Sequence, residues 1–302
     1  MKTAHLFPAF VPEYLGIEPE VIQSFGIDIQ SYFEKASKIT GTDLTHFNIV
    51  ENNFQDQPLG SQYVAYIFSC CVSDLLHQQK NIPDYVISYS MGIYAALYHC
   101  RSIDFSTGLQ MIDEAYNCIE RNLPPERSGM CAIGGLSFDD INTLIKPYRE
   151  EIFIINQNSE FSFLLSGNQS KLKQTLDAAA IEGAMQVRML PVSQPYHTST
   201  LKNAAAEFSN ALLKMKINDS VFPYISSMDQ RIVICKQEIV DELISNLYKG
   251  FNWWKTMNFV LQNQTHFLIE CGAGESLYKI GKFIDGDFQI LNLKKLKLFL
   301  ER

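Results

Sequence analysis

The chain has 302 residues, 46% of them hydrophobic, which is enough for one large α/β domain or two unequal ones. Its net charge of −8 at neutral pH disfavours nucleic acid and anionic membranes as main partners, because both attract basic surfaces. The chain opens without a signal-peptide pattern and contains no run of about 18 apolar residues, so we expect a soluble, cytoplasmic protein.

Short apolar runs alternate with longer helical patterns along the chain, which is typical of an α/β fold. The apolar runs predict strands at 5–10, 85–87, 130–133, 152–156, 163–166, 185–190 and 266–270. The longer patterns predict helices at 62–78, 93–98, 106–121, 137–146 and 169–182.

The stretch 128–191 reads strand, helix, strand, strand, helix, strand, and the polar residues 156–160 are expected to form the turn between its middle strands. A proline-containing boundary at 122–128 precedes it. We therefore predict a large α/β-hydrolase-like body with a parallel sheet, formed by 1–125 and 196–302. A small ferredoxin-like βαββαβ subdomain, 126–195, is inserted into it.

The seven cysteines form an odd set without C-x-x-C spacing, and most lie in apolar surroundings. This pattern indicates free thiols in a reducing compartment and argues against a metal site. We expect no cofactor. The G-A-G-E-S segment at 272–276 lacks the G-x-G-x-x-G spacing of a nucleotide loop and reads instead as a turn from a strand into a helix.

Residues 85–97 read Y-V-I-S-Y-S-M-G-I-Y-A-A-L, an apolar run followed by a serine with a small residue two places to each side, then a helix-forming stretch. A sharp turn from strand to helix leaves no room for large side chains, so Ser88 and Gly92 fit there. Ser90 is then a candidate nucleophile, and the N–H of Met91 a candidate oxyanion donor. The alternative is a buried strand and helix with a chance serine.

A nucleophilic serine needs a base, and the chain has six histidines. Five read as ordinary residues of strands, helix ends or turns: His5, His46, His77, His99 and His266. His197 follows P-V-S-Q-P-Y in a proline-bounded loop, where its side chain can face a cleft. An imidazole titrates near neutral pH and suits a serine hydroxyl, so His197 is the candidate general base.

Six blocks, in order, resemble the malonyl-CoA:acyl-carrier-protein transacylases of fatty-acid and polyketide synthesis. They are S-Y-S-M-G-I-Y-A-A-L, S-G-M-C-A-I-G-G-L, I-N-Q-N-S-E-F-S-F-L-L-S-G, L-P-V-S-Q-P-Y-H, N-L-Y-K-G-F-N-W and F-L-I-E-C-G-A-G, and they span nearly the whole chain. The resemblance implies a dyad of Ser90 and His197, with the imidazole oriented by the backbone or the side chain of Asn246 in place of a carboxylate. It also implies that Gln62, Asn158 and Tyr196 contact the substrate.

The reaction that the resemblance implies is a ping-pong transfer. Ser90 attacks an acyl thioester, carries the acyl group as an ester, and passes it to the phosphopantetheine thiol of an acyl carrier protein. The implied partners are that carrier protein and an acyl-CoA or acyl-carrier thioester.

Two departures from the family pattern bear on the oxyanion site. The family's early F-P-G-Q-G-S-Q reads F-P-A-F-V-P-E here, so Phe10 takes the place of a glutamine whose N–H helps to bind the oxyanion. Phe10 retains a backbone donor, whereas Pro12 changes the turn, so we expect this loop to have moved. Position 89 holds a tyrosine in place of the family's histidine.

A third departure concerns the acyl group. Counting from Ser90 places the family's carboxylate-binding arginine at Ala115, beside Asp113 and Glu114. Arg121 lies on a different helical face and is a poor replacement. Because a charge-assisted pair is worth roughly 1.5 to 3 kcal/mol, its loss predicts an acyl group without a free carboxylate.

Three functions remain open. The first is acyl transfer to a carrier protein, with an acyl group other than malonyl. The second is hydrolysis of the same acyl-Ser90 intermediate, which would clear acyl groups from carrier proteins. The third is noncatalytic binding of carrier proteins, which the presence of both Ser90 and His197 argues against. The basic C-terminal segment 291–302 reads as a docked helix, with attraction of an acidic carrier protein as an alternative role.

Overall fold

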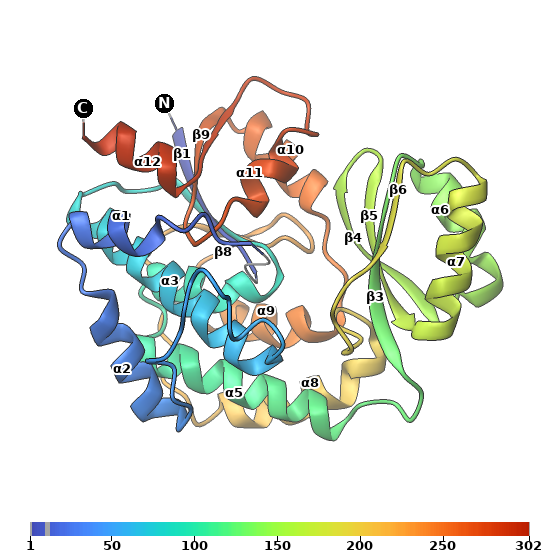
Figure 1. The fold of residues 1–302 in the computed structure, drawn as a ribbon, viewed down its shortest axis with the longest axis horizontal. Helices are drawn as coiled ribbons and strands as arrows, with labels where there is room; N and C mark the ends of the chain where they lie inside the picture. The colour runs from blue at the N-terminus through green and yellow to red at the C-terminus, as the bar shows by residue number, and fades with distance from the viewer. Residues whose placement is uncertain (1, 10–12, 302) are drawn as a thin grey trace.

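The computed structural model describes residues 2–9 and 13–301 (Figure 1). Two sheets organise this part of the chain. Within it, no helix combines the length and apolar character needed to cross a membrane. The seven cysteines are free thiols, all buried except Cys235.

The larger sheet has the strand order β10-β9-β1-β2-β7-β8. Its strands are β1 (Lys2–Phe7), β2 (Tyr85–Ser88), β7 (Tyr224–Ile225), β8 (Ile232–Val233), β9 (Thr265–Glu270) and β10 (Gln289–Leu291). The pairs are parallel, as predicted, except that β8 runs antiparallel to β7. The link between these two strands is short, and the Ser226 N–H donates to the Arg231 carbonyl across it at 3.0 Å. Because parallel strands need a long crossover connection, such a short link permits only antiparallel pairing.

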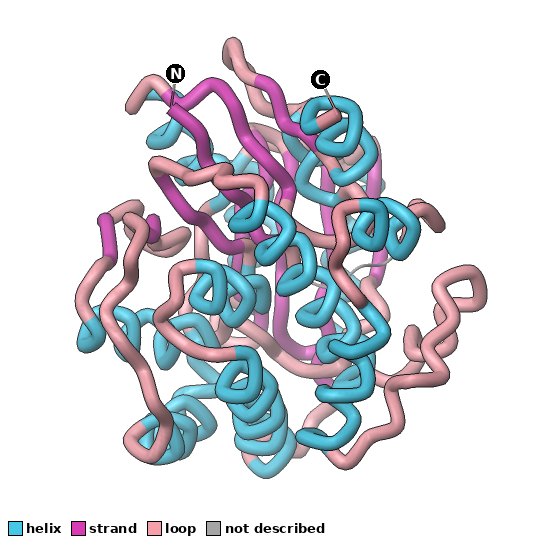
Figure 2. Tube along the Cα trace, turned by 90° about the vertical axis from the view of Figure 1, so that its left-hand side faces the viewer, coloured by secondary structure: helices cyan, strands magenta, loops and turns pink. Residues whose placement is uncertain are grey.

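Helices cover both faces of this sheet (Figure 2). Side chains alternate along β1, so that Ala4 and Leu6 face one helical layer while Phe7 faces the other. The layer on Ala4 and Leu6 contains α10 (Trp253–Gln262) and α11 (Ser276–Gly281). The opposite layer contains α3 (Pro58–Gln78), α4 (Ile93–His99), α5 (Phe105–Arg121), α8 (Lys202–Leu212) and α9 (Lys236–Tyr248).

The C-terminal segment forms α12 (Leu293–Leu300), which packs beside α1 (Glu18–Ser24). Leu293 and Leu296 are buried there, which confirms the predicted docked helix. The sequence patterns did not single out α1, α2 (Ile29–Thr40) or α8 as helices. Their apolar stripes are shorter than that of α3, and only packing against α3 and α5 makes them distinct from loops.

The smaller sheet is antiparallel, with the order β4-β5-β3-β6. It consists of β3 (Ser128–Gly134), β4 (Ile152–Ser159), β5 (Ser162–Asn168) and β6 (Gln186–Met189). On its outer face lie α6 (Phe138–Ile145), followed by η2 (Lys146–Tyr148), and α7 (Gln169–Ile181), at the right of Figure 1. This arrangement confirms the predicted ferredoxin-like βαββαβ unit. The boundaries at 125 and 195 remain a prediction.

Two sequence predictions were wrong in detail. Residues 156–159 belong to β4, and the turn is reduced to Glu160 and Phe161. The side chains of Asn156 and Asn158 find hydrogen-bond partners in Tyr89 and Trp253, which lie outside the strand. The first strand ends at Phe7 and not at residue 10, because Pro8 has no N–H to continue the ladder. Phe10 lies outside the described residues.

Candidate active site

Ser90 lies at a sharp turn between β2 and α4, within the short helix η1 (Ser90–Gly92). Its φ of 52° is in the left-handed region, which residues other than glycine rarely occupy. Tyr89 just before it is extended, with φ −104° and ψ 109°. The chain therefore makes the strand-to-helix turn that was expected from the sequence, and strained backbone of this kind clusters at functional sites.

The two small residues flanking Ser90 have steric reasons to be small. A Cβ added to Gly92 would lie 2.1 Å from the carbonyl oxygen of Phe7. Ser88 is buried, and its Oγ lies 2.7 Å from the hydroxyl of Tyr224. Larger side chains at either position would push β2 away from its neighbouring strands.

His197 lies in the loop before η3 (Ser199–Leu201) and meets Ser90 across the fold. Its Nε2 is 2.6 Å from the Oγ of Ser90. The loop is fixed by the His197 N–H, which donates to the Leu247 carbonyl at 2.9 Å, and by a φ of 60° at His197. The two residues are 107 positions apart, so only the tertiary fold brings them together.

The second ring nitrogen of His197 faces a backbone carbonyl. Its Nδ1 lies 3.2 Å from the carbonyl oxygen of Lys249, which accepts a hydrogen bond only if Nδ1 carries the proton. Nε2 is then the acceptor for the Ser90 hydroxyl. Of the two expected roles of Asn246, the backbone carbonyl interacts with the imidazole, whereas the side chain donates through Nδ2 to the Ser90 carbonyl at 3.4 Å.

Burial keeps His197 neutral. It lowers the pKa of His197 to about 4, against smaller raising effects from the carbonyls of Lys249 and Asn246. The ring of Phe251 covers the imidazole at 4.9 Å between centroids. A neutral imidazole whose Nε2 carries no proton can accept the proton of the Ser90 hydroxyl at neutral pH.

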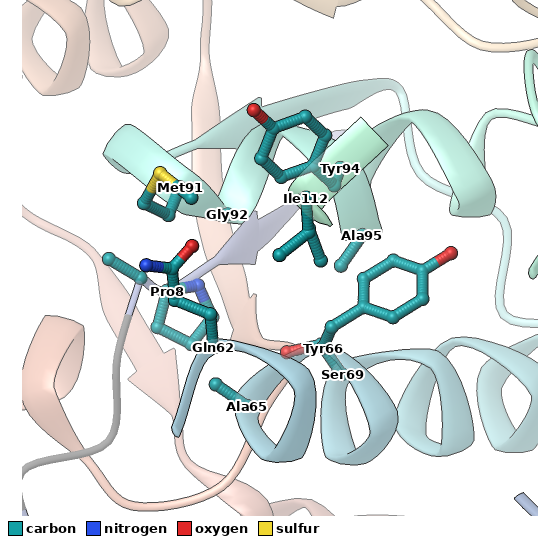
Figure 3. Close-up of a pocket in the computed structure, with 11 residues that line it drawn as sticks. Pro8, Gln62, Ala65, Tyr66, Ser69, Met91, Gly92, Tyr94, Ala95 and Ile112 are labelled. Atoms are coloured by element: carbon teal, nitrogen blue, oxygen red, sulfur yellow. The ribbon is translucent and has the colours of Figure 1, made fainter. Parts of the chain in front are cut away.

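Two small cavities lie beside Met91, the residue that follows Ser90. One lies between β1, α3 and α4, with Met91 and Gln62 at one end and Tyr66 at the other (Figure 3). The other is lined by His197, Asn246 and Ala115, and shares Gln62, Met91 and Tyr94 with the first. Each has room for about one water molecule.

Neutral groups line both cavities, the imidazole of His197 included. Among residues 2–9 and 13–301, no lysine or arginine contributes to either wall. Two buried polar atoms of the wall, Gln62 Oε1 and the Tyr94 hydroxyl, have no hydrogen-bond partner within that part of the chain. Ala115 is only 1% exposed and faces the cavity beside His197.

The charged residues considered from the sequence lie elsewhere. Arg121 pairs at the surface with Glu207 at 2.8 Å, so it does not replace the missing arginine. Asp113 accepts a hydrogen bond from Tyr63 at 2.9 Å. Neither Asp113 nor Glu114 lines a cavity, so the repulsion that we expected from them does not act from the cavity wall.

The remaining predicted residues divide between the cavity and the small sheet. Tyr196 lines the cavity of His197, and its hydroxyl accepts from Gln62 Nε2 at 3.3 Å. Met91 lines both cavities. Asn158 lies on β4 and accepts from the hydroxyl of Tyr89, so it contacts the turn and not the cavity. Phe10, the second predicted oxyanion donor, lies outside the described residues.

Sequence reasoning missed three participants, namely Lys249, Phe251 and Tyr94. Lys249 and Phe251 sit within the N-L-Y-K-G-F-N-W block, which was read only for Asn246. Tyr94 lies in α4, four residues after Ser90, which is about one helical turn. Their roles depend on a backbone carbonyl, a ring contact and a cavity, none of which a sequence pattern encodes.

The other histidines and the 272–276 segment are accounted for by structure. His5 Nδ1 lies 2.9 Å from His99 Nε2 in a separate buried cluster. Glu270 accepts the N–H groups of Leu277 and Tyr278 at 2.9 Å, so a carboxylate of the chain occupies the start of α11. This agrees with the interpretation of 272–276 as a turn.

Known proteins resemble the chain along nearly its full length, although no protein-family model matches it. It is 23% identical to the malonyl CoA-acyl carrier protein transacylase of Staphylococcus aureus (strain MRSA252) over 305 residues, covering 98% of this chain and 96% of that protein. The crystal structure of FabD from Acinetobacter baumannii superposes with a TM-score of 0.89 at 24% identity, covering 99% and 97% of the two chains.

A second similar structure is PlMCAT:AntF (holo), a type II PKS acyl-carrier protein in complex with its malonyl-transacylase. The matching chain has a TM-score of 0.86 at 22% identity, with 97% of this chain and 96% of that chain covered. Sequence similarity and fold therefore agree. The chain is a divergent relative of the malonyl-CoA:acyl-carrier-protein transacylases.

Proposed function

We propose that the chain is an acyltransferase that moves an acyl group from a CoA or carrier-protein thioester to an acyl carrier protein through an acyl-Ser90 intermediate. The observation that carries this proposal is the 2.6 Å contact between Ser90 Oγ and His197 Nε2. The relatives named as transacylases support it, as does the similar malonyl-transacylase that forms a complex with its acyl-carrier protein.

The chemistry follows from the two nitrogens of His197. Nε2 removes the hydroxyl proton as Ser90 Oγ attacks the thioester carbonyl, and the imidazolium then protonates the departing thiolate. In the second half, Nε2 removes the proton of the phosphopantetheine thiol, whose sulfur attacks the ester carbonyl, and the imidazolium returns that proton to the departing Ser90 Oγ. The Met91 N–H is the proposed donor to the oxyanion in both halves. Asn246 holds the Ser90 carbonyl in place.

We propose further that the acyl group lacks a free carboxylate. A carboxylate beside Ala115 would be buried among neutral groups, and an unpaired buried charge is strongly disfavoured. Gln62 and Tyr196 would contact the acyl group as neutral partners. Asn158 would support the turn through Tyr89, without touching the substrate.

Mass measurement of the intact protein tests both proposals. Wild type incubated with acetyl-CoA or butyryl-CoA is expected to gain one acyl mass, which Ser90→Ala abolishes. Malonyl-CoA at equal concentration is expected to react at least about 10-fold more slowly, as the loss of a charge-assisted pair predicts. An adduct that persists in Ser90→Ala would contradict the mechanism, and faster malonylation would contradict the acyl assignment.

Ala115→Arg provides the matched gain-of-function variant. It returns a cation to the cavity wall and is expected to raise malonylation relative to acetylation. Because the cavity is small, the variant is also expected to slow acetylation itself. A variant that slows both acyl groups in equal proportion would argue that position 115 does not face the acyl group.

Hydrolysis of acyl-Ser90 is a second candidate. The cavity lined by His197 has room for about one water molecule beside the base, which favours attack by water on the ester. Loss of the adduct without any acceptor, at a rate that carrier protein does not increase, would support hydrolysis. Loss that requires the carrier thiol would support transfer. A wild type that binds carrier protein without ever forming an adduct would point to the noncatalytic function.

A further inference from the structure

Tyr89, the residue before Ser90, is held by two asparagines of the small sheet. Its hydroxyl donates to Asn158 Oδ1 and accepts from Asn156 Nδ2, each at 2.9 Å. Asn156 Nδ2 also donates to Asn158 Oδ1 at 2.7 Å. Asn156 Oδ1 accepts the Trp253 N–H at 3.0 Å, which determines the end of the amide that faces Tyr89.

The same strand, β4, also holds the segment 249–253, whose first residue supplies the carbonyl partner of the base. The Phe251 N–H donates to the Ile155 carbonyl at 2.9 Å. Asn252 Nδ2 donates to Gln157 Oε1 at 3.1 Å. The strand β4 therefore bonds both to this segment and to Tyr89, and Asn156 bonds to both.

The ring of Phe251 connects Tyr89 to the imidazole of His197. It meets Tyr89 edge to face, with centroids 5.0 Å apart and an interplanar angle of 84°. It also contacts the imidazole of His197 at 4.9 Å and 62°. Phe251 is buried, so the ring has little freedom to move away from either partner.

From this geometry we propose that Tyr89 is a positioning residue for the Ser90–His197 pair. Its hydroxyl fixes the turn to β4 through Asn158, while its ring supports the ring of Phe251 against the base. The small sheet then sets the separation of nucleophile and base. This inference rests on the proposed function, because it concerns the rate at which Ser90 is acylated.

Tyr89→Phe tests the hydroxyl alone. Asn156 remains bonded to Asn158 and to Trp253, and the ring contacts persist. One N–H of Asn156 Nδ2 loses its acceptor, so the variant also loses some stability. The expected result is an acylation rate at saturating thioester about 5- to 10-fold lower than wild type, the equivalent of one hydrogen bond. The thioester concentration for half-maximal rate should not change, because Tyr89 lines neither cavity.

Tyr63→Phe is the matched control. It removes the hydroxyl of another buried tyrosine, which donates to Asp113 at 2.9 Å and lines neither cavity. We expect it to lose stability of similar size with no change in acylation rate. A lower rate in this control, equal to that of Tyr89→Phe, would assign the effect to general destabilisation and overturn the proposal.

A double-mutant cycle with Asn158→Ala separates positioning from a merely structural role. If the hydroxyl acts through Asn158, then Asn158→Ala alone lowers the acylation rate, and adding Tyr89→Phe lowers it by less than about 2-fold more. Full additivity, or a Tyr89→Phe rate equal to wild type, overturns the inference while leaving acyl transfer intact. A wild type without any acyl adduct overturns the proposed function and this inference with it.

Discussion

The Nδ1 of His197 lies 3.2 Å from the carbonyl oxygen of Lys249, so a backbone group and not a carboxylate side chain accepts this hydrogen bond. A carbonyl holds the imidazole in one tautomer but adds no negative charge beside it. The orientation of the His197 imidazole therefore depends on the backbone position of residue 249 and not on the side chain of that residue.

Lys249→Met should consequently leave acylation of Ser90 within about 2-fold of wild type, because the carbonyl remains and the Lys249 side chain lies over Tyr248. His197→Ala, in contrast, should lower the acylation rate by about 100-fold or more, as expected for loss of a general base. Stopped reactions analysed by mass provide both rates. A large loss in Lys249→Met would mean that the side chain, and not the carbonyl, orients the imidazole.

The pH dependence of acylation should reflect the burial of His197. Its neutral form is the active base, and burial lowers the pKa of His197 to about 4, so the rate should stay nearly constant as the pH falls from 7 to 5. An ordinary histidine would lose most of its neutral form below about pH 6.5. Initial acylation rates measured from pH 7 to 5 distinguish a buried imidazole from an ordinary one. A rate that falls with a midpoint near pH 6.5 would show that the imidazole is hydrated.

Folding stability should fall over the same range, for a different reason. Burial lowers the pKa of His5 to about 4 and holds that of His99 well below its usual range. The unfolded chain therefore binds protons first, and stability is lost as the pH drops below about 6.5, at about 1.4 kcal/mol per pH unit for each such histidine. Urea unfolding at pH 7 and 5 measures this, and His5→Gln should reduce the difference. Burial raises the pKa of Glu242 and Glu270 to about 7, so these carboxyls bind protons in the folded state and oppose part of the loss. The contribution of His5 is therefore the difference between wild type and His5→Gln, and an equal pH dependence in the two proteins would contradict it.

Gly92→Ala should destabilise the protein by about 1 to 3 kcal/mol or more, because its Cβ would lie 2.1 Å from the Phe7 carbonyl oxygen and β1 would have to move. Gly134→Ala is the control, since its Cβ would make an ordinary contact at 3.7 Å. Thermal unfolding of both variants provides the comparison. Similar losses in the two would show that the turn after Ser90 relaxes more easily than its geometry indicates.

Met91→Ala should change the preferred acyl length. Met91 lines both cavities, so truncation joins two spaces that each hold about one water molecule. Acylation by hexanoyl-CoA should rise relative to acetyl-CoA by about 10-fold, as expected for a few added methylenes in an apolar pocket. The measured quantity is the ratio of the two rates. An unchanged ratio would place the acyl chain outside these cavities.

The sequence alone determined the local geometry of the nucleophile. A strand, small residues at 88 and 92, and a following helix leave one sterically allowed turn, and the structure has it, with Ser90 at φ 52°. The spacing of apolar runs similarly determined β2 and β9 to within one residue at each end. These features depend on neighbours a few positions apart, which is the range that a sequence pattern describes.

Only the tertiary structure decided what surrounds that serine. Asn156 and Asn158 look like turn residues, yet they lie in β4 because Tyr89 and Trp253, distant in the chain, satisfy their amides. The Lys249 carbonyl near His197 is equally invisible in sequence, since every residue has a carbonyl and only the fold brings this one within 3.2 Å. Long-range partners of this kind carry no local signal, because their energy is gained only when both segments are already in place.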